Sequence, residues 1–381
     1  MWKTHHCYAG VTFSGVGAVL TFFLNSMPLH LLINITFAGC TFLEGAALQF
    51  VGGAEAAESS GVQIRVSQTV MRSSAVAFLL VLPQHCDIAV TEVDAVQAFE
   101  VYLPDTVGSM MSVVILDDLV LTASSLLVSN VRARALRYRG FGLHSTGLLK
   151  LVDGSSLYVR YCSFEEYTYM FYAALLSVSD HSVFALLNNT MASGTSLLYQ
   201  HHGFGVSDHS VLRVVGNRGS VCYVIYSLNF CIAQESSWLD WRDNDVEVGA
   251  IFYDTESAFL SIDGSSVVTL TGCKMGSTGL SGPLLSRADA GYRFVAGCLT
   301  VAGRVVTTAA ELELHGITNV TTVAVCGECT KDGVCFAPLT TAVIDCKCQC
   351  AAEGHGDVCV PAPVPAGPPP SPPLPPPTPP L

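Results

Sequence analysis

The sequence predicts an all-β fold, a right-handed parallel β-helix or β-solenoid with repeats of about 27 to 28 residues. Three observations predict it. Alternating apolar runs recur at a fixed spacing, and Ser, Gly, Asp and Asn clusters separate them. The 381 residues are 50% hydrophobic and only 13% charged, although no segment is a convincing membrane span. A unit this short cannot bury its own apolar face, so neighbouring units must stack into one core.

Each repeat contains an acidic residue, then a serine, then an alternating apolar run. The clearest copies begin at Leu149, Leu176 and Phe204. The anchoring acidic residues are Asp153, Asp180, Asp208, Glu235 and Asp263, with separations of 27, 28, 27 and 28 residues. A poorer copy follows at Asp289, and a partial copy precedes them near Ala123. A β-propeller is the competing architecture, but its blades need about 40 to 50 residues.

A second position repeats in the same register, nine residues after the anchors. It is occupied by Cys162, Asn189, Asn217, Asn244, Gly272 (followed by Cys273) and Cys298. Equivalent residues of stacked coils lie about 4.8 Å apart. We therefore expect these residues to form a ladder in which asparagine amides bond to one another and to turn backbone.

The acidic anchors should form a column along one edge of the solenoid, and that column has two interpretations. Carboxylates are calcium ligands, but the Gly-rich nonapeptide of solenoid calcium sites is absent. The favoured interpretation is that each Asp closes an Asx-turn onto the residue two places later. His181 and His209 share one repeat position and are interpreted as turn residues. No metal or other cofactor is expected.

The first 30 residues leave two alternatives open. Residues 7–24 carry no charge and follow Lys3, which is typical of a weak signal peptide or signal anchor. The same residues are rich in Gly, Thr, Ser and Val, which fits a first pair of buried strands. The solenoid is expected over residues 31–322.

Residues 323–360 are predicted to form a cysteine-rich module. Cys348, Cys350, Gly356 and Cys359 match the C-x-C-x5-G-x2-C signature of epidermal-growth-factor-like modules, which rely on disulfides in place of a core. The candidate disulfide cysteines are Cys298, Cys326, Cys329, Cys335, Cys346, Cys348, Cys350 and Cys359, and their pairing stays open. A four-thiolate zinc site using Cys326, Cys329, Cys346 and Cys348 is the alternative.

The cysteine-rich module and the glycosylation sequons together favour an oxidising, extracytoplasmic setting. Glycosylation sequons lie at Asn34, Asn188 and Asn319. Thirteen of the 18 prolines fall within residues 361–381, so this tail is predicted to be an extended, disordered stalk.

Charge and motifs exclude several function classes. The net charge of −13 disfavours nucleic acid as a partner, because a phosphate backbone would repel the chain. No nucleophile elbow, phosphate loop, zinc-protease motif or dinucleotide fingerprint occurs. The cluster of Arg132, Arg134, Arg137 and Arg139 lacks acidic neighbours in sequence. We expect no enzyme, although a polysaccharide-active β-helix is the alternative.

The run from Leu149 onward resembles the dispersed gene family proteins of trypanosomes. The phrases VDGSSLYVRYCSF, SVSDHSVFALLNNT, SVLRVVGNRGSVCYVIYS and SIDGSSVVTLTGC carry this resemblance, together with VAGCLTVAGRVVTTAAELELHGITNV and the cysteine-rich VCGECTKDGVC. INITFAGCTFLEGAAL near Asn34 is similar as well. The resemblance implies a surface or secreted glycoprotein with β-helix repeats and no established catalysis. Family members are longer and end in membrane spans, so this chain is similar to a shortened or fragmentary member.

The sequence thus predicts a non-catalytic extracellular or cell-surface protein that adheres through one solenoid face. The expected partner is a host-cell or matrix protein or glycan. A gene fragment without function is the third interpretation.

Overall fold

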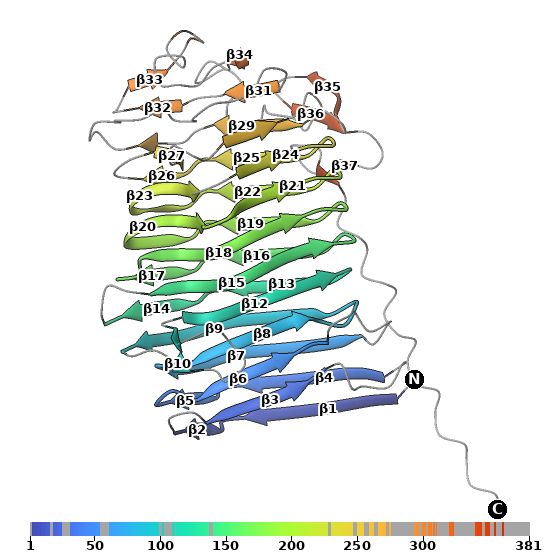
Figure 1. The fold of residues 1–381 in the computed structure, drawn as a ribbon, viewed down its shortest axis with the longest axis vertical. Helices are drawn as coiled ribbons and strands as arrows, with labels where there is room; N and C mark the ends of the chain where they lie inside the picture. Colours follow the sequence, from blue (N-terminus) through green and yellow to red (C-terminus); the bar gives the residue numbers. More distant parts are fainter. Residues whose placement is uncertain are drawn as a thin grey trace, which may run out of the picture.

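The computed structural model is a tall stack of β-coils (Figure 1). It describes residues 2–15, 18–24, 31–53, 61–98, 101–102, 109–110, 112–136, 140–227, 230–246, 250–254, 259–262, 266–271, 274–275, 293–296, 299–301, 304–306, 308, 310, 320–323, 340–344, 347–350, 354–355 and 360–361. Every named element within these ranges is a strand. The predicted all-β parallel solenoid is therefore confirmed.

Each coil contributes strands to three faces, and each strand pairs in parallel with its equivalents in the coils before and after it. Face 1 consists of β1 (Trp2–Ala9), β4 (Leu31–Ala38), the first half of β7 (Val62–Arg72), the first half of β9 (Asp87–Gln97), β13 (Ser125–Ser129), β16 (Ser156–Arg160), β19 (Val183–Leu187), β22 (Val211–Val215), β25 (Trp238–Arg242), β29 (Val267–Thr271), β31 (Arg293–Ala296) and β34 (Val320–Val323).

Face 2 follows face 1 around each coil. It consists of β2 (Thr12–Ser14), β5 (Thr41–Leu43), the second halves of β7 and β9, β14 (Arg132–Ala135), β17 (Ser163–Glu165), the start of β20 (Thr190–Gln200), the start of β23 (Arg218–Ser227), β26 (Asp245–Val246), β30 (Lys274–Met275) and β32 (Leu299–Val301). A last strand, β33 (Arg304–Val306), pairs antiparallel with β32.

Face 3 is the widest, and its strands bend near their middle. It consists of β3 (Val19–Phe23), β6 (Ala47–Val51), β8 (Ala75–Val81), β12 (Ser112–Thr122), β15 (Phe141–Val152), β18 (Tyr169–Val178), the ends of β20 and β23, β21 (Gly203–Val206), β24 (Phe230–Ala233), β27 (Ala250–Asp254) and β28 (Phe259–Ile262).

Three short hairpins lie outside the coils. β10 (Val101–Tyr102) pairs with β11 (Ser109–Met110), within an insertion between faces 2 and 3. Near the carboxyl terminus, β35 (Thr340–Ile344) pairs with β36 (Lys347–Cys350), and β37 (Gly354–His355) pairs with β38 (Val360–Pro361). Cys348 and Cys350 lie in β36, and the other predicted disulfide cysteines lie outside the described residues. The proline tail beyond residue 361 also lies outside them.

The amino-terminal residues form strands. β1, β2 and β3 pair with β4, β5 and β6 and so make up the first coil. Of the two alternatives for residues 7–24, the structure has strands at this position. Within the described part of the chain, no helical segment has the length and apolar character needed to cross a bilayer.

The core is a single apolar column enclosed by the three faces. On face 1, alternate residues of each strand point inward, as Leu157 and Val159 do in β16, and these residues are fully buried. On face 3, Phe22, Phe50 and Phe78 occupy one register position in successive coils. Their rings stack, with centroids 5.4 Å apart for the first pair and 5.3 Å for the second. Parallel pairing at a constant spacing thus converts a sequence repeat into continuous side-chain stacks.

Replacing Phe50 tests this core. Phe50→Ala removes a fully buried ring that stacks on both neighbours, so we expect a loss of about 3–5 kcal/mol in the free energy of unfolding. The control is Phe23→Ala, because Phe23 lies on the same face but is 57% exposed. Urea unfolding followed by circular dichroism measures both. Equal losses for the two variants would contradict the stacked core.

Candidate binding surface

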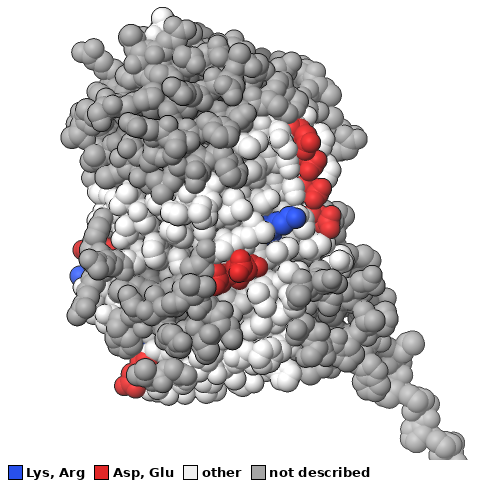
Figure 2. All heavy atoms as spheres, in the orientation of Figure 1, with Lys and Arg blue, Asp and Glu red and all other residues white. Residues whose placement is uncertain are grey.

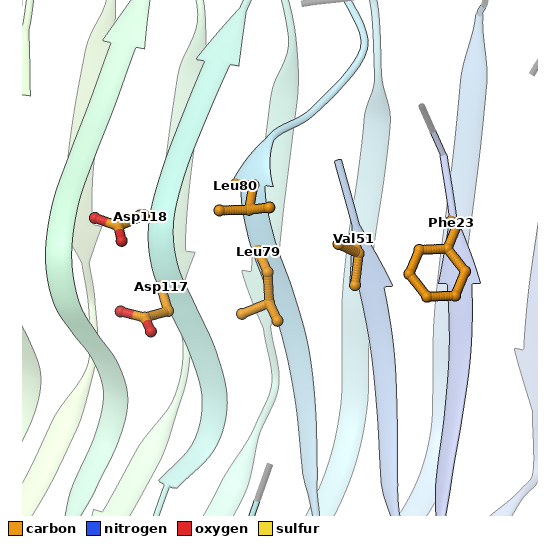
Figure 3. Close-up of a pocket in the computed structure, with 6 residues that line it drawn as sticks. All are labelled: Phe23, Val51, Leu79, Leu80, Asp117 and Asp118. Atoms are coloured by element: carbon orange, nitrogen blue, oxygen red, sulfur yellow. The ribbon is translucent and has the colours of Figure 1, made fainter. Parts of the chain in front are cut away.

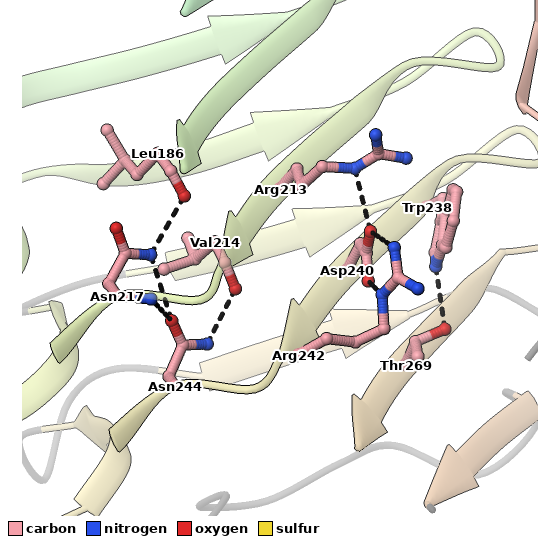
Figure 4. Close-up of polar contacts among 9 residues, drawn as sticks. All are labelled: Leu186, Arg213, Val214, Asn217, Trp238, Asp240, Arg242, Asn244 and Thr269. Carbon is pink, nitrogen blue, oxygen red and sulfur yellow. Dashed lines mark hydrogen bonds and ion pairs between the residues drawn. The ribbon is translucent and has the colours of Figure 1, made fainter. Parts of the chain in front are cut away.

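The predicted asparagine ladder lies at the corner between faces 1 and 2, and it is fully buried. The backbone N–H of Cys162 donates to Asn189 Oδ1 (3.0 Å), that of Asn189 to Asn217 Oδ1 (3.0 Å), and that of Asn217 to Asn244 Oδ1 (3.1 Å). Asn189 and Asn217 also donate through Nδ2 to the next ladder oxygen. All three asparagines donate through Nδ2 to a carbonyl of the preceding coil, as Asn217 does to Leu186 and Asn244 to Val214 (Figure 4). Gly272, Cys273 and Cys298 lie outside the described residues.

Cys162 fits the ladder through its thiol. Its Sγ lies 3.3 Å from the carbonyl of Arg160 and 3.8 Å from that of Val128. The Val128 carbonyl is equivalent to the carbonyls that the asparagine Nδ2 groups contact in later coils. Burial raises the pKa of this thiol to about 12, so it stays protonated and able to donate. In the turn beside the ladder, each coil has a residue with positive φ, namely Asn130, Tyr161, Asn188, Gly216 and Asp243.

The acidic column lies at the corner between faces 3 and 1, and Figure 2 shows it as a file of red groups along one edge. Asp153, Asp180, Asp208 and Glu235 all have positive φ, between 52° and 58°. Successive turns bond through the backbone, because the N–H groups of Gly154, His181 and His209 donate to the acidic residue of the next coil at 2.7–2.9 Å. Asp263 lies outside the described residues.

The predicted Asx-turn differs from the structure. The carboxylates of Asp180 and Asp208 accept from the preceding serine hydroxyls instead, both at 3.3 Å. The residue two places after each of the four described anchors is a buried serine, and serine hydroxyls of this column accept backbone hydrogen bonds in the stack. Ser155 N donates to Ser182 Oγ (3.1 Å), and Ser182 N donates to Ser210 Oγ (3.0 Å). The repeating serine was visible in the sequence, but only the structure shows that it is buried in the turn.

Two pairs of histidines contact each other, one at this corner and one between β20 and β21 at the bend of face 3. His181 and His209 stack with ring centroids 5.2 Å apart and an interplanar angle of 4°. His202 contacts its neighbour His201, with Nδ1 of His201 3.3 Å from Nε2 of His202. Among the described residues, no group of three or more His, Cys, Asp or Glu side chains is arranged to hold a metal ion.

The other predicted residues are dispersed. Arg132 and Arg134 are exposed on β14, and Arg134 Nε lies 3.9 Å from Glu165 in the next coil. Asn188 is exposed in its turn, whereas Asn34 is half-buried in β4, where its Oδ1 accepts from Thr36. Arg137, Arg139 and Asn319 lie outside the described residues.

An aromatic cluster on the outer side of face 3 was missed in the sequence. The cluster includes His144, Tyr172 and Tyr199, which occupy one register position in successive strands. The same backbone position continues at Tyr226 and Tyr253. Tyr172 and Tyr199 stack at 5.1 Å between centroids. Phe141 and Tyr169 form a neighbouring stack at 5.7 Å, and Tyr169 contacts Tyr199 at 4.3 Å. These aromatics recur at the same spacing as the acidic anchors, so the repeat itself carried the signal.

A shallow groove lies on the same face in earlier coils. Phe23, Val51, Leu79 and Asp117 share one outward register position, and Leu80 and Asp118 complete the wall (Figure 3). Its volume is about 200 Å³. Leu80 is 42% exposed, and Asp118 is fixed because its Oδ1 accepts from the Leu148 N–H at 3.0 Å.

Comparison with known protein families gives two matches. A family model described as the DGF-1 beta-sheet domain matches residues 34–190, and one described as the DGF-1 N-terminal domain matches residues 262–360. Together they cover more than half of the chain. No curated protein and no solved structure matches the chain.

The asparagine ladder should stabilise the stack. Asn217→Ala removes two donated and two accepted hydrogen bonds inside the core, so we expect a loss of about 2–4 kcal/mol in the free energy of unfolding. Asn188→Gly is the control, because it alters an exposed asparagine with positive φ that glycine tolerates. We expect it to change stability by about 0.5 kcal/mol or less. Similar urea midpoints for Asn217→Ala and Asn188→Gly would contradict a stabilising role of the ladder.

His144 should make stability depend on pH. Burial lowers its pKa to about 4, below the ordinary value of about 6.5. The unfolded chain therefore binds a proton that the folded chain refuses, and stability falls as the pH drops from about 6.5 towards 4. His144→Phe should reduce the loss between pH 7.5 and pH 4.5 by about 2–3 kcal/mol in urea titrations. Identical pH profiles for the two proteins would be evidence against this effect.

Proposed function

The chain belongs to the DGF-1 family, and from that premise we propose that it is a non-catalytic, extracellular surface or secreted protein that adheres through face 3. The partner is a host-cell or matrix protein or glycan. One observation carries the choice of face: its outer side combines an aromatic cluster with an almost uncharged strip.

The strip and the aromatic cluster lie on either side of the bend in face 3. One outward register position runs through Lys150, Ser177, Gly205, Ile232 and Ser261. Lys150 is the one charged residue at this register position, and the register position of Tyr172 and Tyr199 carries no Asp, Glu, Lys or Arg. Figure 2 shows a mostly white surface beside the acidic file, interrupted by one blue group and one cluster of red groups. A flat surface with little charge costs little desolvation when a partner covers it.

The partly exposed members of the aromatic cluster, Phe141, Tyr169 and Tyr172, supply the contact chemistry, and they lie against the buried His144 and Tyr199. Tyr169 and Tyr172 are half-buried, so they are fixed in place before any partner binds. Rigid tyrosines lose little conformational entropy on binding and offer both apolar area and a hydroxyl. Such residues are enriched among those that dominate binding energy at interfaces.

The extracellular setting supports the same proposal. The DGF-1 family is a surface protein family, and Asn188 presents a sequon in an exposed turn. The cysteine-rich module, its disulfides and the proline stalk are parts of the proposal that follow from the sequence. The handedness of the solenoid is likewise a prediction.

Binding of the purified chain to cultured host cells and to immobilised matrix tests the proposal. Tyr169→Ser with Tyr172→Ser should weaken binding about tenfold, the change that a loss of 1.4 kcal/mol produces. Tyr158→Ser is the matched control, because Tyr158 is a half-buried tyrosine in the same coil but on face 1. Equal binding by all three proteins would assign adhesion to another surface.

A further inference from the structure

Two arginines share one buried carboxylate on the outer side of face 1 (Figure 4). Arg213 lies opposite Asp240 in the parallel pair of β22 and β25. Arg213 Nε is 2.8 Å from Asp240 Oδ2. Arg242 donates from Nε to Oδ1 at 2.6 Å and from Nη2 to Oδ2 at 3.0 Å. The Asp240 side chain is fully buried, while both arginine side chains are 19% exposed.

Trp238 forms an aromatic platform beneath these guanidinium groups. The Cζ atoms of Arg213 and Arg242 lie 5.1 and 5.9 Å from its ring centroid, within the range of cation–π attraction. The ring is itself fixed, because its Nε1 donates to Thr269 Oγ1 in the next coil at 2.8 Å. Carboxylate and indole together hold Arg213 in one orientation.

This arrangement leaves hydrogen-bond donors on Arg213 unused. Its Nε faces Asp240, and neither of its Nη groups has a protein partner within the described residues. Asp240 also pairs with Arg242. Asp243 lies near Arg242 as well: burial raises the pKa of Asp243, and the Arg242 guanidinium opposes that rise. The two guanidinium groups are thus balanced by two carboxylates, and what Arg213 leaves unused is its pair of Nη donors. A largely buried cation with free donors is costly unless an anion or water satisfies it.

We propose that Arg213, positioned by Asp240 and Trp238, binds an oxyanion group, either a carboxylate or a tetrahedral sulfate or phosphate. The two free Nη groups present the planar fork that pairs with two oxygens of such a group. The site lies on face 1, so it is distinct from the adhesive surface proposed on face 3. Each of the two proposals can therefore be refuted without affecting the other.

The surroundings restrict the ligand. The acidic column runs along the edge of this same face, with Asp208 and Glu235 at the turns that precede β22 and β25. The whole chain carries a net charge of −13. Both repel an extended polyanion. The ligand is therefore a single oxyanion, free in solution or carried by an otherwise neutral molecule.

Isothermal titration of the full chain with sodium sulfate or sodium acetate, at constant ionic strength set by chloride, tests the site. Arg213→Lys keeps the charge but loses the fork, and it should weaken oxyanion binding about tenfold. Arg160→Lys is the control, because Arg160 is an exposed arginine on the same face. Wild type and this control should bind alike. Dextran sulfate should bind no tighter per sulfate than the free ion.

Asp240→Asn gives a second, opposite readout that does not depend on Arg213→Lys folding. The amide oxygen can still accept from the arginines, but the competing negative charge is gone, so oxyanion affinity should rise several-fold. Equal affinity of wild type and Arg213→Lys would overturn the proposal, as would unchanged or weaker binding by Asp240→Asn. Much tighter binding of dextran sulfate than of sulfate would refute the single-oxyanion ligand.

Discussion

Parallel hydrogen bonding between successive coils is the constraint on which the whole molecule depends. It places each residue directly beside its equivalents in neighbouring coils, about 4.8 Å away. Every side chain must therefore be compatible with copies of its own position. Apolar residues satisfy this by stacking, as Phe22, Phe50 and Phe78 do. Charged residues are absent from the apolar core cluster, because a buried charge needs a partner of opposite sign.

At the two corners of the coil, polar residues are buried where the stack itself provides their partners. Asn189, Asn217 and Asn244 are completely buried, and each finds its donor or acceptor in an adjacent ladder residue. Cys162 continues the ladder with a weaker donor. Serines form the corresponding ladder at the other corner. These ladders define where each coil turns, so they fix the register of the faces between them.

The candidate binding surfaces result from the outward positions of that same register. Face 3 repeats tyrosine, serine and glycine, which gives a broad surface with little charge. Face 1 carries in one place a carboxylate between two arginines. A solenoid can therefore vary its outer columns while the inward ones remain constant.

The sequence alone determined the fold class, because the two-residue alternation and the constant repeat from Asp153 onward leave few alternatives. It also located the asparagine ladder by residue number. Before Asp153 only a partial copy of the repeat, near Ala123, was recognised. The equivalent corner position advances by 38 residues from Cys86 to Ser124 and by 31 to Ser155, before it settles at 27 and 28. Insertions at the coil edge change the spacing without disturbing the pairing. Only the tertiary structure decided which residues meet across coils. Arg213, Asp240 and Trp238 converge because β22 and β25 pair in register, and that contact is set by the three-dimensional stack rather than by any local motif.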